Sequence, residues 1–177
     1  LHTVGDQITE ALLLHKKVTI KQAVNGACEM LKLVGFPNAQ RALKTYPFEL
    51  SGGLRQRAMI AMALICRPSL LIADEPTTAP DVTIQAQILK LMDDLQTELE
   101  MAILMITHDL GVVANIADDV VVMYRGEIME SGAKDYIFRN PEHPYLKSLM
   151  TAVPRFGMKD NERLIPCLLY TSPSPRD

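Results

Sequence analysis

Hydrophobic positions in the first third of the chain repeat with helical spacing. Over residues 8–42 apolar side chains recur every three or four positions, which predicts amphipathic helices. One predicted face carries Ile20, Val24, Ala27, Cys28, Leu31 and Val34. Gly35 is expected to end this helix, because glycine readily adopts the left-handed conformation found after helix ends. A further apolar run over residues 58–66 follows a Ser-Gly-Gly turn and predicts another helix.

After residue 69 short apolar runs alternate with longer helical stretches. The runs at residues 70–73, 102–106 and 120–123 predict three strands, and the first two are expected to be fully buried. A helix between the first two is predicted from the apolar positions Ile84, Ile88, Leu91, Leu95 and Leu99. Arg125-Gly126 predicts a tight turn that pairs the third strand with residues 127–130 as a hairpin. This alternation predicts an α/β fold with a mostly parallel sheet flanked by helices.

The composition is that of an ordinary globular chain. Of the 177 residues, 48% are hydrophobic and 22% are charged, which is enough apolar material for one core. The longest apolar run, residues 58–66, is far shorter than the roughly 20 residues of a membrane-spanning helix. A net charge of −3 without a basic stripe disfavours nucleic acid as a partner. Cys28, Cys66 and Cys167 are too widely spaced for a metal site, and a reducing cytosolic setting fits them.

The first candidate for chemistry is a short turn directly before the helix that contains the apolar run over residues 58–66. Ser51 can cap this helix, and Gly52 and Gly53 leave its first amide hydrogens exposed, which is an arrangement that binds anions. Arg55 and Arg57 lie in the opening turns, where positive charge opposes the helix dipole. A bound phosphate would remove that conflict.

The second candidate is a pair of carboxylates, Asp74 and Glu75, directly after the first predicted strand. Ligands bind at the carboxyl ends of strands in open α/β sheets. His108 and Asp109 follow the second strand in the same way, and Asp109 is expected to cap the next helix. Taken alone, a Ser-Gly-Gly turn is more often a simple cap, and an Asp-Glu-Pro turn is more often a solvated loop.

Together these motifs resemble one family, the ATP-binding subunits of ABC transporters. The resemblance rests on LSGG at residues 50–53, Gln56-Arg57, LLIADEPT at residues 70–77, Asp81 and His108-Asp109, and it extends from residue 1 to about residue 154. Three further stretches resemble oligopeptide and dipeptide importers in particular: YPFELSGG at residues 46–53, TIQAQIL at residues 83–89 and the segment over residues 140–154.

The resemblance implies a partial P-loop NTPase fold with an added helical subdomain. It assigns residues 1–68 to the helical subdomain, 69–133 to the rest of the nucleotide-binding core and 134–165 to an importer-type extension. Residues 166–177 are rich in Ser and Pro and have no periodicity, so we expect a disordered tail of foreign origin. The chain is expected to be truncated at its amino end.

The resemblance also implies ATP and Mg²⁺ as ligands. Asp74 would hold Mg²⁺, because this cation prefers carboxylate and phosphate oxygens. Glu75 would act as general base toward the attacking water. His108 would contact the γ-phosphate. These three residues are the predicted metal ligand and catalytic residues.

The remaining implied site residues would bind the nucleotide, and Ser51, Gly52 and Gly53 would cover the γ-phosphate held by the opposite subunit. These remaining residues are Ser51, Gly52, Gly53, Gln56, Arg57 and Asp81, of which Asp81 is expected to cross the dimer interface. Leu54 stands where many family members have glutamine. Pro80 stands where the family usually has leucine, and it removes an amide hydrogen and restricts the preceding residue.

By resemblance, the whole protein would be an ATPase that drives import of peptides, or of a related solute such as nickel. Its partners would be membrane permease subunits, a second identical or different ATP-binding subunit and, indirectly, a solute-binding protein, at the cytoplasmic face of the membrane. None of the nine glycines begins the loop GxxxxGK[ST] that holds phosphates, so this chain alone is expected to bind ATP weakly without turnover. Two alternatives stay open: a non-transport ABC ATPase acting on DNA or ribosomes, which the segment over residues 140–154 disfavours, and a non-catalytic binding module.

Overall fold

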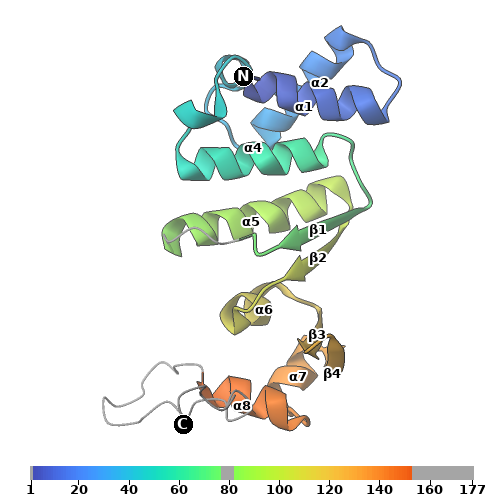
Figure 1. The fold of residues 1–177 in the computed structure, drawn as a ribbon, viewed down its shortest axis with the longest axis vertical. Helices are drawn as coiled ribbons and strands as arrows, with labels where there is room; N and C mark the ends of the chain where they lie inside the picture. The colour runs from blue at the N-terminus through green and yellow to red at the C-terminus, as the bar shows by residue number, and fades with distance from the viewer. Residues whose placement is uncertain (1, 77–81, 153–177) are drawn as a thin grey trace, which may run out of the picture. The chain divides into compact units, whose positions relative to one another are not determined.

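The computed structural model describes residues 2–76 and 82–152. The chain forms two compact units, Leu1–Ile106 and Thr107–Asp177, and Figure 1 gives the order of their elements. Within the described ranges, none of the helices combines the length and the apolar character that crossing a membrane requires. The domains predicted from the resemblance, with boundaries after residues 68, 133 and 165, are defined by function and not by compactness. That division stays a prediction.

Four α-helices and a short 3-10 helix open the first unit, as the helical spacing predicts. They are α1 (Val4–His15), α2 (Ile20–Leu33), α3 (Ala39–Ala42), η1 (Pro47–Glu49) and α4 (Gly52–Leu64). Thr3 and Thr19 start α1 and α2 with capping boxes, in which the threonine oxygen accepts from the third helical amide. Gly35 follows the end of α2 with φ +81°, which confirms its expected role as the stop.

The buried face of α2 differs from the predicted one at its amino-terminal half. Ile20 is 72% exposed and Val24 is also exposed, whereas Ala23 and Ala27 are fully buried. One residue corresponds to about 100° of rotation around the helix axis. In the amino-terminal half of α2, the buried stripe is therefore the one next to the predicted stripe. The small alanine side chains let α2 pack closely against α1 and α4, which bulkier residues at these positions would prevent.

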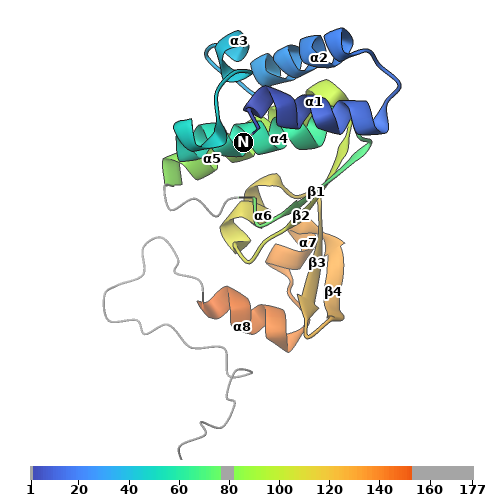
Figure 2. The ribbon, with the colours of Figure 1, turned by 45° about the horizontal axis from the view of Figure 1, so that its top comes forward.

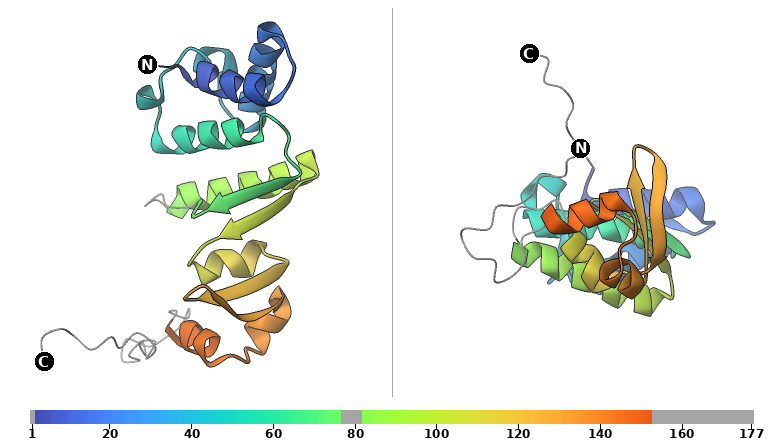
Figure 3. Two further views of the ribbon diagram at one scale, coloured as in Figure 1. Left: turned by 45° about the vertical axis from the view of Figure 1, so that its right-hand side comes forward. Right: turned by 90° about the horizontal axis from the view of Figure 1, so that it is seen from below.

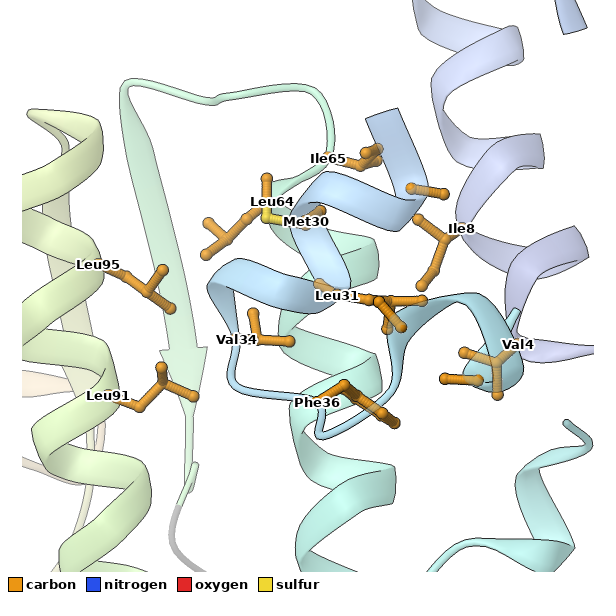
Figure 4. Packing of buried hydrophobic residues seen from close by; sticks show 14 of the residues in the cluster. Val4, Ile8, Met30, Leu31, Val34, Phe36, Leu64, Ile65, Leu91 and Leu95 are labelled. Atoms are coloured by element: carbon orange, nitrogen blue, oxygen red, sulfur yellow. The ribbon is translucent and has the colours of Figure 1, made fainter. Parts of the chain in front are cut away.

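The core of the first unit is shared by several helices, including α3 through Ala39 and Ala42, and Figure 4 shows part of it. Buried side chains come from α1, α2, α4 and α5 and from the loop after α2: Val4, Ile8, Met30, Leu31, Val34, Phe36, Leu64, Ile65, Leu91 and Leu95. Truncating one such leucine to alanine typically costs about 2–5 kcal/mol. This core fixes α4, and therefore the turn that precedes it, against its neighbours.

A parallel strand pair completes the first unit. β1 (Leu70–Asp74) pairs with β2 (Ala102–Ile106) from Leu70↔Ala102 to Asp74↔Ile106. The connecting helix α5 (Val82–Leu99) lies alongside both strands and packs on Ala73 (Figure 3). The expected burial of both faces is wrong, since Ile72 is 60% and Leu104 is 50% exposed. Burial alternates along the strands because the described elements cover only one face of this pair.

The second unit contains the predicted hairpin and three helices. β3 (Asp119–Tyr124) pairs antiparallel with β4 (Glu127–Ala133), which is longer than the predicted residues 127–130. Arg125 and Gly126 both have positive φ, as a tight two-residue hairpin turn requires. The helices are α6 (Leu110–Ile116), α7 (Lys134–Arg139) and α8 (Pro144–Ala152), and α7 lies beside the hairpin (Figure 2). The α/β alternation and the parallel pairing of β1 with β2 are therefore as predicted, while β3 and β4 form a separate antiparallel pair.

Candidate functional site

The turn before α4 presents free amide groups to solvent. Ser51 has an extended backbone, and its Oγ accepts a hydrogen bond from the Leu54 amide at 3.4 Å, which confirms the predicted cap. Gly52 and Gly53 occupy the first two helical positions, whose N–H groups have no acceptor within a helix. A Cβ added to Gly52 would meet nothing within 4 Å, so there is open space beside Gly52, whereas a Cβ added to Gly53 would lie 3.6 Å from the Ile84 side chain. The turn therefore has the donors and the room for an anion.

Arg57 is engaged with the helical layer. Its Nη1 donates to the Val34 carbonyl oxygen at 2.6 Å, at the carboxyl end of α2, where helix carbonyls carry partial negative charge. A Cβ on Gly35 would lie 2.7 Å from the same Nη1. Glycine is thus required at this position by space as well as by its positive φ. The charge that opposes the dipole of α4 is compensated by the end of α2.

Gln56 connects α4 with the carboxylate turn. Its Nε2 donates to the carbonyl oxygen of Pro76, which lies two residues after Asp74. The Ser51 turn and the carboxylate turn are therefore linked inside one unit by a single half-buried side chain. Whether Gln56 and Arg57 also contact a nucleotide stays a prediction, because here both side chains donate to backbone carbonyls.

The carboxylate turn begins at the end of β1. Asp74 is the last residue of the strand and is exposed, and Glu75 is half-buried. The Glu75 amide donates to the Ile106 carbonyl at 2.9 Å, which extends the pairing with β2 by one bond. Glu75 has φ +46°. This conformation costs a residue other than glycine about 1–3 kcal/mol, and such strained residues cluster at functional sites.

The first unit's described residues include all of the predicted site residues except Asp81 and His108. Asp81 and the neighbouring Pro80 are outside the described residues. His108 belongs to the second unit and is exposed. Asp109 caps α6 as predicted, since its Oδ1 accepts from the amides of Gly111 at 2.8 Å and Val112 at 3.2 Å. The structure therefore brings together the Ser51 turn, Gln56, Arg57, Asp74 and Glu75, all in the first unit.

The donor set suits a nucleotide-bound magnesium ion better than a resident metal. Among residues 2–76 and 82–152, no three His, Cys, Asp or Glu side chains are grouped closely enough to hold a metal ion. Asp74 offers one exposed carboxylate at a strand end. Mg²⁺ is commonly bound by one or two carboxylates together with substrate phosphates and water. Asp74 fits that role without further protein ligands.

The second unit contains a carboxylate cluster that is not among the residues predicted from sequence. Glu130 on β4 accepts hydrogen bonds from the backbone amides of His143 at 2.9 Å and Glu142 at 3.0 Å, and these bonds lower the pKa of its carboxyl. Tyr136 donates its hydroxyl to Glu142, which raises the Tyr136 pKa. His143 is half-buried, and its Nδ1 accepts a hydrogen bond from the Tyr145 amide. No local sequence pattern predicts this cluster, because Glu130 lies 12 and 13 residues from the two amides that donate to it.

Comparison with known sequences identifies close relatives. A family model described as ABC transporter matches residues 2–78. The chain is 59% identical over 157 residues to a Brucella melitensis protein provisionally assigned as a peptide import ATP-binding protein, covering 89% of this chain and 46% of that protein. It is 54% identical over 175 residues to the glutathione import ATP-binding protein of Escherichia coli K12, covering 97% of this chain and 28% of that protein. The chain thus spans less than half the length of these curated relatives.

Solved structures share the fold. A cassette of Clostridium perfringens that is part of an ABC transporter complex has a TM-score of 0.67 and 28% identity, covering 78% of this chain and 54% of that one. A bacterial ABC transporter cassette solved as a dimer has a TM-score of 0.63 and 27% identity, covering 76% and 57%. The predicted fold class is confirmed. In sequence and in fold, the chain is similar to ATP-binding proteins of the ABC transporter family.

Proposed function

We propose that the protein containing this chain is the ATP-binding subunit of an importer for peptides or a related small solute. Two kinds of relative support the cargo class, one assigned to peptide import and the other to import of glutathione, which is itself a short peptide. Its partners are a membrane permease, a second ATP-binding subunit and, indirectly, a solute-binding protein. The subunit works at the cytoplasmic face of the membrane, bound to the permease.

The observation that carries this proposal is the link, within one unit, between the Ser51 turn and the carboxylates that follow β1. The Ser51 turn offers amide donors for phosphate oxygens, and Asp74 and Glu75 offer carboxylates at a strand end. Gln56 joins the two through the Pro76 carbonyl. Donors for phosphate and carboxylates for a metal ion and a water molecule are what nucleotide hydrolysis needs.

The direction of the helix supports a nucleotide held by a second subunit. N–H groups in the first turn of a helix point out along its axis, away from the helix body. Gln56, which donates to the carboxylate turn, lies about 7.5 Å further along α4 than Ser51 by helix rise. A phosphate in front of Gly52 and Gly53 is therefore turned away from this subunit's own Glu75. In a head-to-tail pair, each Ser51 turn would meet the phosphate beside the other subunit's Glu75.

Each residue then has a defined task. ATP with Mg²⁺ supplies the phosphoryl group and the neutralising charge. Asp74 holds the metal ion, Glu75 accepts the proton of the attacking water, and His108 donates to the departing phosphate. The Ser51 turn binds the γ-phosphate across the interface, where the chain near Asp81 also approaches.

Replacing Glu75 with glutamine in the full-length protein tests this function. Glu75→Gln keeps the shape of the side chain and removes the base, so ATP binding should persist while turnover falls by about a hundredfold or more. Nucleotide binding by calorimetry and phosphate release measure the two quantities separately. The matched control is Glu127→Gln on β4, an exposed glutamate that should leave both unchanged. Full turnover in Glu75→Gln, or no ATP binding by the wild type, would contradict the proposal.

A further inference from the structure

Gln56 holds the turn that carries Glu75, and its own helix begins at the Ser51 turn. We propose that Gln56 is a positioning residue that transmits the position of the Ser51 turn to Glu75 of the same subunit. This inference rests on the proposed function, because it concerns the same reaction. It assigns to Gln56 a role distinct from the nucleotide contact expected from sequence.

Hydrogen bonds hold the backbone on both sides of Glu75. On the amino side, its own amide donates to the Ile106 carbonyl of β2 at 2.9 Å. On the carboxyl side, the carbonyl of Pro76 accepts from Gln56 Nε2. The left-handed φ of Glu75 is unfavourable for a residue with a side chain, so it needs such support from its surroundings. Of these two bonds, only the one from Gln56 comes from outside the strand pair.

The helix α4 is itself fixed at the next residue. Arg57 donates to the Val34 carbonyl at 2.6 Å, and Gly35 leaves room for the guanidinium. Two consecutive side chains of α4 therefore attach it to two different turns, one after α2 and one after β1. A displacement of the opening of α4 would therefore act on the Pro76 carbonyl through Gln56.

This arrangement couples two events that occur on different nucleotides. The Ser51 turn binds a phosphate held by the partner, while Glu75 serves the nucleotide of its own subunit. A phosphate bound at the Ser51 turn would pull α4 toward itself. Gln56 would pass that displacement to the backbone next to Glu75. Closure over one nucleotide would thereby align the base at the other. Gln56 should therefore affect the rate of turnover and leave ATP affinity nearly unchanged.

The test uses the full-length protein with two substitutions of Gln56. Gln56→Glu is isosteric but has no donor and places a carboxylate against the Pro76 carbonyl, so kcat should fall about tenfold or more while KM for ATP stays within about twofold. Gln56→Lys keeps a donor on a longer side chain and should recover most of the lost kcat. The matched control is Gln87→Glu, the same change at an exposed position of α5, with wild-type kcat and KM expected.

Three results would overturn the inference: wild-type kcat in Gln56→Glu, a raised KM with unchanged kcat, or no recovery in Gln56→Lys. A raised KM alone would indicate a direct nucleotide contact. If Gln56→Glu fails to fold, Gln56→Met, of similar length and without donor or charge, replaces it with the same expected loss of kcat. Failure of the proposed function is distinguishable, because the wild-type protein itself would then show no turnover.

Discussion

Gly35 and Glu75 both adopt a positive φ, yet they do so for different reasons. At Gly35 a side chain would collide with the Arg57 guanidinium, so the position needs glycine for packing as well as for conformation. At Glu75 a carboxylate is kept in spite of the conformational cost. A strained residue at the end of a strand, supported by hydrogen bonds on both sides, is typical of a site where the side chain direction matters.

Gly35→Ala should therefore destabilise the protein by about 1–3 kcal/mol, because it adds backbone strain and pushes Arg57 away from the Val34 carbonyl. Urea unfolding followed by circular dichroism measures this change. The matched control is Gly52→Ala, where φ is not positive and the added Cβ meets no atom within 4 Å. Equal unfolding midpoints for Gly35→Ala and wild type would show that neither strain nor crowding is present.

How far the site can be predicted from sequence depends on the distance along the chain between interacting groups. The Ser51 cap and the position of Asp74 at a strand end follow from neighbouring residues, and both are confirmed. The contacts of Gln56 and Arg57 are formed with carbonyls 20 and 23 residues away. Such contacts depend on how α4 packs against the rest of the unit, which periodicity does not specify.

At the scale of elements, the same limit explains the errors in burial. Helical spacing locates α2 and the burial of Ala27, but it does not decide which of two adjacent stripes faces α1 and α4 at the start of the helix, where Ala23 is buried instead of Ile20 and Val24. Apolar runs locate β1 and β2 as well. A continuous apolar run predicts cover on both faces, whereas the described elements provide it on one.

The hairpin of the second unit should lose stability in acid through Glu130. Hydrogen bonds from the His143 and Glu142 amides hold the pKa of Glu130 below its ordinary value of 4.5. A group whose folded-state pKa is lowered contributes stability above the unfolded pKa and loses it as the pH falls toward the folded value. The contribution should therefore be complete near neutral pH and decline below about pH 4.5.

Thermal unfolding of the second unit, measured as the pH is lowered, checks this expectation. Glu130→Gln should lower the unfolding temperature at neutral pH. In acid, the unfolding temperature of this variant should depend less on pH than that of the wild type. Glu127→Gln, an exposed change on the same strand, should keep the wild-type pH dependence. A wild-type acid profile in Glu130→Gln would show that the two amide contacts contribute nothing to stability.

At the scale of the whole molecule, the account requires two copies of the site to work together. Gln56 links α4 to the carboxylate turn of the same unit, whereas the Ser51 turn at the start of α4 is proposed to bind a phosphate held by the other subunit. A complete hydrolytic site would then combine Glu75 of one subunit with Ser51 of another. Relatives of this fold include a cassette solved as a dimer.

The measurement that tests this claim most directly is the turnover of mixed dimers of the full-length protein. Ser51→Arg blocks the turn, Glu75→Gln removes the base, and each variant alone should be inactive. If the turn acts across the interface, a dimer of Ser51→Arg with Glu75→Gln contains one site with both defects and one intact site. The matched control pairs wild type with the double variant, and it then contains no intact site.

Differently tagged subunits, copurified through both tags, allow ATP turnover to be measured on each mixed dimer alone. The account predicts recovered turnover in the dimer of Ser51→Arg with Glu75→Gln, and little or none when wild type is paired with the double variant. The reverse result, with turnover only in the dimer that retains one wild-type subunit, would show that Ser51 serves its own subunit's nucleotide and would contradict the account.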